Sequence, residues 1–381
     1  MKLVYLIAGE QSGDVLGARL MRAMRAERSD LTFAGVGGSA MAAQGLETLF
    51  PMSDLAVMGL VEVLPKLRLL RGRIRQTVED IAARRPDVVV TIDSPGFTIR
   101  VLRQIAHLGL KRAHYVAPQV WAWRAHRVKK YPGLWDSLLC LLPFEPAFFA
   151  KHGLPAMFVG HPVLESGAGT GDGAGFRARH GIAPDALVLT VMPGSRRTEV
   201  SRLLPILGET LRRLPVGVVP VVPLAGPVAD AVRAGTASWA VKPILVADIA
   251  EKFDAYAASN AALTKSGTST LELALAGVPM VVTYRVNPIT AWIVRRTVQV
   301  KYASLLNLLA KRAVIPELIQ EDCTPEKLSA VLRGLLMDPS AGAAQVAAYR
   351  PMLESLHAPI GSPSQAAARA VLGLLNSSND K

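Results

Sequence analysis

Asp93 is the first candidate catalytic residue, because it directly follows a predicted buried strand. It follows residues 88–92, a short β-branched apolar run that is typical of a parallel strand buried on both faces. Ser94, Pro95 and Gly96 then turn the chain. Ligands of open α/β sheets bind beyond the carboxyl ends of the strands, so we expect Asp93 to face a ligand. Taken alone, these residues favour a helix-capping role for Asp93, and only the rest of the chain reverses that preference.

A second candidate site is the loop that follows the apolar run 187–192. Its sequence Pro-Gly-Ser-Arg ends at Arg196 and leads directly into a helical pattern. Main-chain N–H groups at the start of a helix, together with a guanidinium group, suit a diphosphate. Arg196 is therefore the candidate anion contact, whereas favourable placement in the first helical turn explains Glu199.

The stretch 266–272, with the sequence SGTSTLE, joins another strand to a helix in the same half of the chain. Its hydroxyl and N–H groups suit phosphate oxygens, and the carboxylate further into the helix suits a ribose diol. Helix capping explains the hydroxyls equally well. Two such loops on one sheet are more specific than either alone. They predict a nucleotide site whose candidate residues are Ser266, Gly267, Thr268 and Glu272.

Three other features are weaker candidates. The glycine-rich turn 9–14 lets the backbone approach either a ligand or a neighbouring helix. A tryptophan-rich basic segment and a lone histidine after a strand suit an acceptor pocket, although such residues are more often structural. One asparagine in the apolar run 304–309 needs hydrogen-bond partners, which either the backbone or a ligand would supply. The candidate residues in these features are Gly9, Ser12, Gly13, Trp123, His161 and Asn307.

The elements that position these residues are expected to be parallel strands alternating with helices. Strand–glycine turn–helix units in succession predict a doubly wound α/β sheet. The stretch 166–175 has glycine at every other position, and we interpret it as a flexible linker or long loop near a domain boundary. The predicted strands are 2–8, 32–36, 88–92, 112–116, 137–142 and 157–159 before that stretch, and 187–192, 216–222, 244–246, 261–264 and 278–283 after it.

The segment 55–81 differs from the rest of the chain, because leucines and valines alternate there with arginines and a lysine. A helix with a leucine-rich face and an arginine-rich edge suits a membrane interface that contains anionic lipid. An ordinary amphipathic helix with a solvated basic face explains the pattern equally well. The hydrophobic candidates for membrane or acyl-chain contact are Leu60, Val63, Leu64, Leu67 and Leu70.

Composition and charge exclude several classes of protein. The chain of 381 residues is 50% hydrophobic and 19% charged, which allows sizeable cores and argues against disorder. Its net charge of +13 suits nucleic acid, an anionic membrane surface or phosphorylated substrates. Nucleic acid ranks last, because aromatic residues make up only 6% and no nucleic-acid-binding motif is found. Cys140 and Cys323 have no metal-binding spacing, and no apolar run is long enough to span a bilayer.

Taken together, these motifs resemble bacterial lipid-A-disaccharide synthases, a family with the GT-B glycosyltransferase architecture. The resemblance covers nearly the whole chain. The implied fold is two Rossmann-like, doubly wound α/β domains that face a central cleft, followed by a helical C-terminal tail. The motifs are AGEQSGD (8–14), LAVMGLVEVLP (55–65), TIDSPGF (91–97), PQVWAWR (118–124), LPFE (142–145), GHP (160–162), PGSR (193–196), SGTSTLE (266–272) and SLLNLL (304–309).

The resemblance implies transfer of 2,3-diacylglucosamine from its UDP derivative to 2,3-diacylglucosamine 1-phosphate, which gives a β-1,6-linked disaccharide 1-phosphate and UDP. Asp93 matches the family aspartate, so its implied role is general base toward the acceptor 6-hydroxyl, with inversion at the donor anomeric carbon. No metal or other cofactor is expected, and the sequence has no Asp-x-Asp pair. Arg196, backbone donors and helix ends would then meet the charge on the leaving UDP.

Two positions depart from the family motifs. Thr98 stands where the family has an asparagine, so no role is expected for an amide there. Leu306 stands where the family often has proline, whereas the following Asn307 matches.

The resemblance also implies domain limits and a location. The expected domains are 1–165 for the acceptor and membrane, 166–350 for the UDP-sugar, and a helical tail, 351–381, that packs back on the first domain. The expected location is cytoplasmic, on the inner face of the cytoplasmic membrane of a Gram-negative bacterium, where anionic lipid suits the basic chain. The sequence does not specify an oligomeric state. The alternative function is a UDP-sugar epimerase or hydrolase on the same scaffold, which would share the nucleotide loops.

Overall fold

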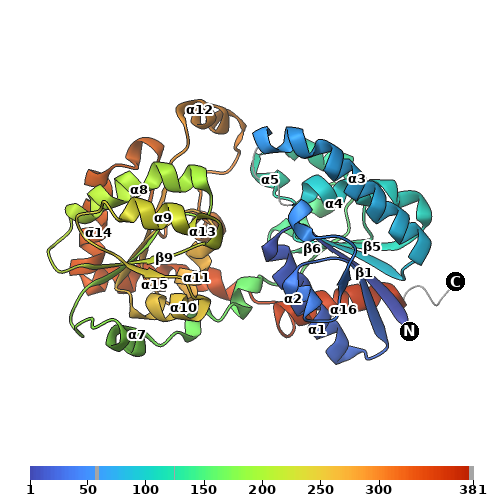
Figure 1. Cartoon of the computed structure of the whole chain (residues 1–381), viewed down its shortest axis with the longest axis horizontal. Helices are drawn as coiled ribbons and strands as arrows, with labels where there is room; N and C mark the ends of the chain where they lie inside the picture. Colours follow the sequence, from blue (N-terminus) through green and yellow to red (C-terminus); the bar gives the residue numbers. More distant parts are fainter. Residues whose placement is uncertain (56–59, 124, 377–381) are drawn as a thin grey trace. The chain divides into compact units, whose positions relative to one another are not determined.

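The computed structural model describes residues 1–55, 60–123 and 125–376, and the side chains of residues 60–66 and Ile293 lie outside this description. The chain forms two compact units, each built on a parallel sheet (Figure 1). Unit 1 comprises Met1–Pro162 and Leu356–Lys381, and unit 2 comprises Val163–Ser355. The chain is thus divided after residues 162 and 355, where the sequence analysis places the limits at 165 and 350.

The sheet of unit 1 has seven strands in the order β3-β2-β1-β4-β5-β6-β7. The strand order reverses between β1 and β4, so the loops after these two strands flank the topological switch point at which ligands bind. Glu47 and Thr48 of β3 are exposed and polar, which is why no apolar pattern predicts this strand. The strands are β1 (Lys2–Ala8), β2 (Leu31–Val36), β3 (Glu47–Thr48), β4 (Val88–Ile92), β5 (Lys111–Tyr115), β6 (Ser137–Cys140) and β7 (Ala156–Phe158).

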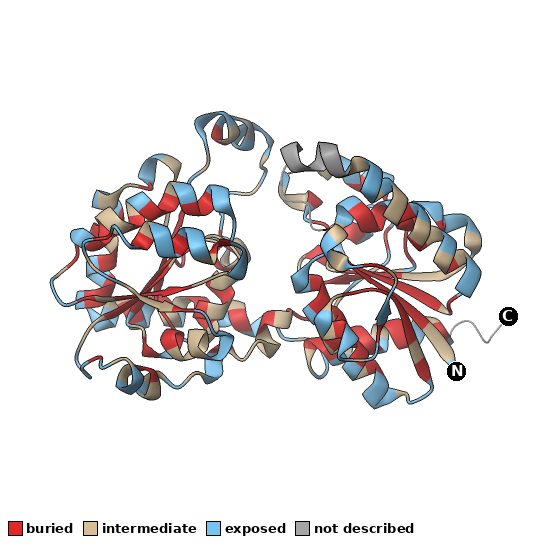
Figure 2. Ribbon diagram, in the orientation of Figure 1, coloured by how far each residue is buried: buried red, intermediate tan, exposed pale blue. Residues whose placement is uncertain are grey.

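Helices cover both faces of this sheet, and Figure 2 shows its central strands largely buried, whereas the edge strands are more exposed. Alternate side chains of β1 enter two different cores, as the period of a strand requires. Leu6 packs with apolar residues of α1 and α16, whereas Ile7 packs on the other face with those of α3 and α4. The helices of unit 1 are α1 (Gln11–Glu27), α2 (Ser39–Ala42), α3 (Leu60–Arg84), α4 (Pro95–Gln104), α5 (Val120–Trp123), α6 (Glu145–Ala150) and α16 (Pro363–Asn376).

The last helix, α16, belongs to unit 1 although it comes after unit 2 in the chain. It packs against α1, and Figure 1 shows the red helix beside the blue one. Val371 and Leu375 are buried in the same core as Met21 and Met24 of α1. The C-terminal segment therefore completes one face of the first sheet.

Unit 2 repeats the same topology with six strands in the order β10-β9-β8-β11-β12-β13. Its switch point lies between β8 and β11. The strands are β8 (Val188–Met192), β9 (Val219–Pro223), β10 (Ile244–Val246), β11 (Ala261–Lys265), β12 (Met280–Tyr284) and β13 (Glu317–Ile319). The helices are α7 (Gly173–Arg179), α8 (Arg197–Arg212), α9 (Ala229–Thr236), α10 (Ile249–Ala258), α11 (Ser269–Leu275), α12 (Pro288–Thr297), α13 (Leu305–Ala310), α14 (Pro325–Met337) and α15 (Pro339–Glu354).

The glycine-rich stretch 166–175 is folded, so the interpretation of it as a flexible linker is wrong. It contains a 3-10 turn at Ala168–Thr170 and the start of α7. A Cβ atom at Gly171 would lie 2.1 Å from the carbonyl oxygen of Phe253, which only glycine avoids. The glycines therefore permit close packing against α10.

Candidate functional site

Asp93 directly follows β4, at the switch point of unit 1. The φ angles of Asp93 and Ser94 are 48° and 44°, so two consecutive non-glycine residues adopt the left-handed conformation. This conformation costs roughly 1–2 kcal/mol per residue. Backbone strain of this kind is concentrated at functional sites, where surrounding contacts hold it in place.

Three neighbouring groups hold the strained turn. The Thr98 hydroxyl donates to the carbonyl oxygens of Asp93 and Ser94, at 2.8 and 3.0 Å. The Asp93 N–H donates to the Tyr115 carbonyl oxygen at 2.9 Å. A Cβ atom at Gly9 would lie 2.6 Å from Ser94 Oγ, so glycine at this position of the N-terminal turn leaves room for the Ser94 side chain.

The carboxylates of Asp93 and Glu10 interact electrostatically at this switch point. Burial raises the pKa of Asp93, the Glu10 carboxylate raises it further, and a hydrogen bond with the Ser94 backbone opposes both. Glu10 is exposed, and it lines a hollow of about 300 Å³ together with Ser94, Pro95 and Arg100 among others. A general base is most effective when its pKa lies near the working pH, so a raised pKa suits proton abstraction. Glu10 was not among the predicted site residues, although it lies in the turn that follows β1.

The other polar residues of the N-terminal turn differ in their surroundings. Asp14 is buried and accepts hydrogen bonds from the N–H groups of Gly38, Ala40 and Met41, so it anchors α2. A Cβ atom at Gly13 would be in ordinary contact with Ala8 and Ile92, whereas Ser12 is exposed in the first turn of α1. The Ser12 side chain is therefore accessible to a ligand, whereas Asp14 is not.

Trp123 is 43% exposed and lines a hollow of about 480 Å³ beside α4. The segment that carries it is anchored by Glu145, a residue that sequence analysis recognised only as part of a family motif. Its buried carboxylate accepts hydrogen bonds from Trp121 Nε1 and from the N–H groups of Leu141 and Leu142, each at 3.0 Å. Burial raises the pKa of Glu145 to about 7, and these three donors oppose the rise.

His161 lies in the interior of unit 1. Its backbone N–H donates to the carbonyl oxygen of Leu356 at 2.8 Å, where the chain re-enters the unit. Burial lowers the pKa of the imidazole to about 4. Gly160 has a φ of 83°, and a Cβ atom there would lie 2.7 Å from the Ala358 nitrogen. The backbone of His161 thus helps fix the turn, and a ligand contact of its imidazole stays a prediction.

In unit 2, Glu199 connects the loops that follow β8 and β11. It is buried, and its carboxylate accepts a hydrogen bond from the Ser195 N–H at 3.2 Å. Its Oε1 atom lies 3.4 Å from both Arg196 Nη1 and Lys265 Nζ. The Arg196 side chain remains 60% exposed. Helix-dipole placement therefore explains only part of the role of Glu199, and the contribution of Lys265 was missed.

Polar side chains of the loop after β11 and of the following α11 form hydrogen bonds with neighbouring segments of unit 2. The Ser266 hydroxyl donates to the Ala303 carbonyl oxygen at 2.6 Å, and Thr268 is exposed. Glu272 Oε2 accepts from Lys252 Nζ at 3.0 Å and from the Tyr256 hydroxyl at 3.3 Å. Gly267, Thr268 and Arg196 thus follow the two strands on either side of the switch point of unit 2.

Asn307 is buried and hydrogen-bonded to the protein itself. Its amide donates to the Ile315 carbonyl oxygen and to Glu317, at 2.9 and 2.7 Å. Its oxygen accepts from the N–H groups of Val314 and Ile315, at 2.7 and 3.0 Å. Glu317 in turn accepts from the N–H groups of residues 303 and 304, next to the Ser266 contact. Asn307 thus supports the backbone next to the predicted nucleotide loop after β11.

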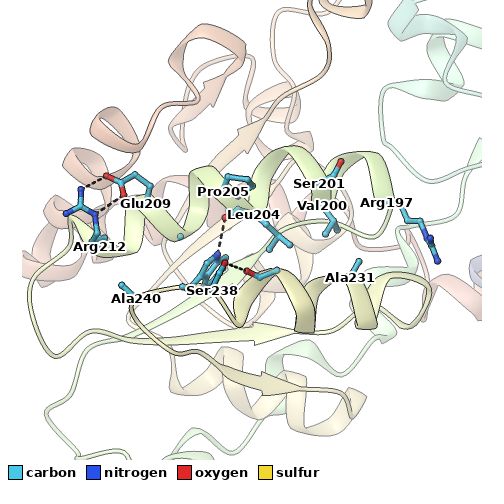
Figure 3. A pocket seen from close by; sticks show the side chains of 13 residues that line it. Arg197, Val200, Ser201, Leu204, Pro205, Glu209, Arg212, Ala231, Ser238 and Ala240 are labelled. Carbon is cyan, nitrogen blue, oxygen red and sulfur yellow. Dashed lines mark hydrogen bonds and ion pairs between the residues drawn. The ribbon is translucent and has the colours of Figure 1, made fainter.

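A separate hollow of about 650 Å³ runs along α8 in unit 2. Figure 3 shows that its side chains come from α8, from α9 and from the segment after α9. The Trp239 indole N–H donates to the Leu204 carbonyl oxygen at 3.2 Å within it. It contains none of the candidate nucleotide residues, so it is not the site that the sequence predicts.

Among the proposed membrane residues, the described side chains divide between core and surface. Leu70 packs partly against the core of unit 1, Leu67 is half-buried, and the neighbouring Leu69 is 39% exposed. The side chains of Leu60, Val63 and Leu64 lie outside the described residues. In the described ranges, no helix is both long and apolar enough to cross a membrane.

Comparison with known proteins decides the family. The family model for lipid-A-disaccharide synthetase matches residues 4–371. The lipid-A-disaccharide synthase of Granulibacter bethesdensis is 56% identical, with 98% of each chain covered. That of Gluconobacter oxydans is 55% identical, with 98% of this chain and 91% of the relative covered. The chain belongs to the lipid-A-disaccharide synthase family. It is a glycosyltransferase of lipid A biosynthesis, as its motifs predict.

Solved structures confirm the fold of this lipid-A-disaccharide synthase family member. A UDP co-structure of Staphylococcus aureus MnaA has a TM-score of 0.66 at 15% identity, covering 100% of this chain and 97% of the other. The Acinetobacter baumannii MurG structure has a TM-score of 0.60 at 15% identity, covering 98% and 100%. The predicted GT-B class, with two doubly wound α/β domains, is therefore correct. Family membership implies a sugar nucleotide and a lipid-linked sugar as substrates.

Proposed function

We propose that the chain transfers 2,3-diacylglucosamine from its UDP derivative to the 6-hydroxyl of 2,3-diacylglucosamine 1-phosphate. The family match over residues 4–371 supports this reaction class. The observation that carries the mechanism is the carboxylate of Asp93, held after β4 on a left-handed turn with its pKa raised. We assign the acceptor to unit 1 and the nucleotide to unit 2.

In this mechanism, Asp93 accepts the proton of the acceptor 6-hydroxyl as that oxygen attacks the donor anomeric carbon. The new carbon–oxygen bond forms while the bond to UDP breaks, and the electron pair of that bond leaves with UDP. Direct attack inverts the anomeric configuration. The raised pKa makes Asp93 a stronger base than an ordinary exposed carboxylate, because the neighbouring Glu10 and burial both disfavour its charge.

We place the leaving diphosphate at the loops after β8 and β11. The exposed Arg196 guanidinium and the N–H groups that begin α8 offer positive charge to phosphate oxygens. Within the described residues, both hydrogen bonds to the Glu272 carboxylate are accepted by Oε2, so Oε1 is the atom we assign to a ribose hydroxyl. This assignment includes no metal or cofactor, because the protein supplies the counter-charge itself.

We also propose that the protein binds peripherally to an anionic membrane surface. On α3, the exposed Leu69 lies between the exposed Arg68 and Arg71. On α12, Ile289 and Trp292 are 73% and 57% exposed, three residues apart and therefore on one side of the helix. Apolar side chains beside arginines suit the headgroup region of an anionic bilayer.

The test of the proposed function is turnover of the purified protein with both diacylated substrates, followed by the mass of the product. We expect the disaccharide 1-phosphate and UDP in equal amounts. The matched control omits the acceptor, and we expect no free sugar and no epimerised UDP-sugar there. Release of either product without acceptor would instead support the epimerase or hydrolase alternative.

A further inference from the structure

One wall of the hollow beside Trp123 is a single face of α4. Gly96, Ile99, Arg100 and Arg103 line it, and their spacing of three, four and seven residues places them on the same side of the helix. The opposite wall is the 3-10 segment Ala125–Lys130 together with the preceding α5. Figure 1 shows α4 and α5 next to each other in unit 1.

The opposite wall adds more positive charge. Arg127 and Lys130 both line the hollow and are three residues apart, a spacing that brings side chains to the same side of a 3-10 helix. Burial raises the pKa of the nearby Tyr131, whereas Arg127 and Arg103 oppose the rise. The two guanidinium groups, one from each wall, thus line the same hollow as the Tyr131 side chain.

These cations have no counter-charge in the part of the chain that the structure describes. The side chains of Arg100, Arg103, Arg127 and Lys130 are exposed and form no ion pair there, and no carboxylate lines the hollow. Elsewhere in unit 1 the pattern differs, since Arg73 lies 2.6 Å from Asp54. Unpaired positive charge around one hollow is the arrangement that binds a phosphate group.

The hollow begins at the turn that carries the proposed base. Pro95, Gly96 and Arg100 line both this hollow and the smaller one that contains Glu10. At about 1.5 Å per residue, Arg103 lies roughly 12 Å along the helix axis from Pro95. In a hexose 1-phosphate, C1 and C5 flank the ring oxygen, so the phosphate lies about one sugar ring away from the 6-hydroxyl. A phosphate site is therefore needed a short distance from Asp93, and this hollow begins at the turn that carries Asp93.

We propose that the hollow between α4 and the segment Ala125–Lys130 binds the phosphate monoester of the acceptor, with Arg103, Arg127 and Lys130 as its main contacts. This inference rests on the proposed function, because it assumes that the acceptor 6-hydroxyl lies at Asp93. The site orients the acceptor and makes the enzyme selective for the phosphorylated sugar. The phosphate of a membrane lipid offers the same chemistry, and the experiment separates the two sources.

The experiment compares two acceptors, 2,3-diacylglucosamine 1-phosphate and its methyl glycoside without phosphate. The test variant is Arg103→Ala with Arg127→Ala. The control variant, Arg22→Ala with Lys129→Ala, removes the same charge from exposed side chains of unit 1 that do not line the hollow. Losing two charge-assisted hydrogen bonds should lower kcat/KM for the phosphorylated acceptor about 100-fold. We expect kcat/KM for the methyl glycoside, the donor KM and sedimentation with anionic vesicles to stay within about twofold of wild type.

Three outcomes with the variants would overturn the proposed phosphate site. These are equal losses for the two acceptors, loss of vesicle binding with full selectivity retained, and a control variant as impaired as the test variant. If the wild-type protein transfers sugar to neither acceptor, the proposed function itself fails. If it transfers equally well to both, the reaction stands and the phosphate site fails. Arg103→Lys with Arg127→Lys should restore part of the selectivity, because charge is kept while the guanidinium geometry is lost.

Discussion

The hydroxyl of Thr98 donates a hydrogen bond to the carbonyl oxygen of Asp93, 2.8 Å away. The same hydroxyl reaches the Ser94 carbonyl oxygen at 3.0 Å, and the Thr98 side chain is wholly buried. Thr98, near the start of α4, thus holds the two consecutive left-handed residues Asp93 and Ser94 in place. Thr98, one of the two positions at which the sequence departs from its family motifs, is therefore a positioning residue for the proposed base.

The first prediction concerns this positioning role. Thr98→Val keeps the shape of the side chain but removes the two hydrogen bonds that the Thr98 hydroxyl donates to the strained turn. We expect kcat to fall about tenfold, the effect of roughly one net hydrogen bond, with both KM values within about twofold of wild type. Thr98→Ser retains the hydroxyl and should keep most of the activity. Steady-state kinetics of the two variants check this, and equal kcat values for valine and serine would contradict it.

The second prediction concerns pH. Glu10 raises the pKa of Asp93, so Glu10→Gln should lower that pKa. Asp93 must be deprotonated to act as a base, and activity therefore rises with pH through its pKa. The acidic limb of the kcat/KM profile should then move to lower pH in Glu10→Gln. A limb that stays in place, or moves to higher pH, would show that the two carboxylates are not coupled.

The third prediction concerns the donor site. Arg196→Ala removes the exposed guanidinium assigned to the diphosphate and should weaken UDP binding by about tenfold or more. Arg197→Ala is the matched control, because Arg197 is the next residue, is also exposed and lines the separate hollow along α8. Calorimetric titration with UDP distinguishes them. Equal weakening by both substitutions would point to a general charge effect.

The fourth prediction concerns the membrane surface. Ile289→Ser with Trp292→Ser replaces two exposed apolar side chains of α12 and should reduce sedimentation with anionic vesicles several-fold. UDP affinity should not change. Val216→Ser is the control, since Val216 is fully exposed elsewhere in unit 2. If the control reduces vesicle binding as much as the α12 variant does, this helix has no special role.

All strands except the edge strands β3 and β13 could be predicted from the sequence, because buried parallel strands have continuous apolar runs. Asp93 and Arg196 were chosen as candidate site residues in this way, since each follows such a run, and their roles stay predictions. Glu10 and Lys265 were missed because their roles depend on neighbours far away in the sequence, Asp93 and Glu199.

The same limit applies to the residues whose roles were left open. The structure surrounds Asn307 with the protein's own hydrogen-bonding groups, and it places His161 in the interior. The sequence alone does not indicate whether the Asn307 amide or the His161 imidazole contacts a ligand or the backbone. The glycines of 166–175 were interpreted as a flexible linker for a related reason. Glycine is favoured both in flexible segments and where the backbone packs closely, so its presence does not distinguish the two.

The most direct test of the account is single-turnover kinetics of Asp93→Asn with saturating donor and acceptor. The substitution preserves the size of the side chain and removes its ability to accept the proton. We expect the transfer rate to fall by about 10²–10⁴-fold, with UDP affinity within twofold of wild type. The surface variant Asp30→Asn should react at the wild-type rate. A transfer rate near wild type in Asp93→Asn would contradict the assignment of Asp93 as the base.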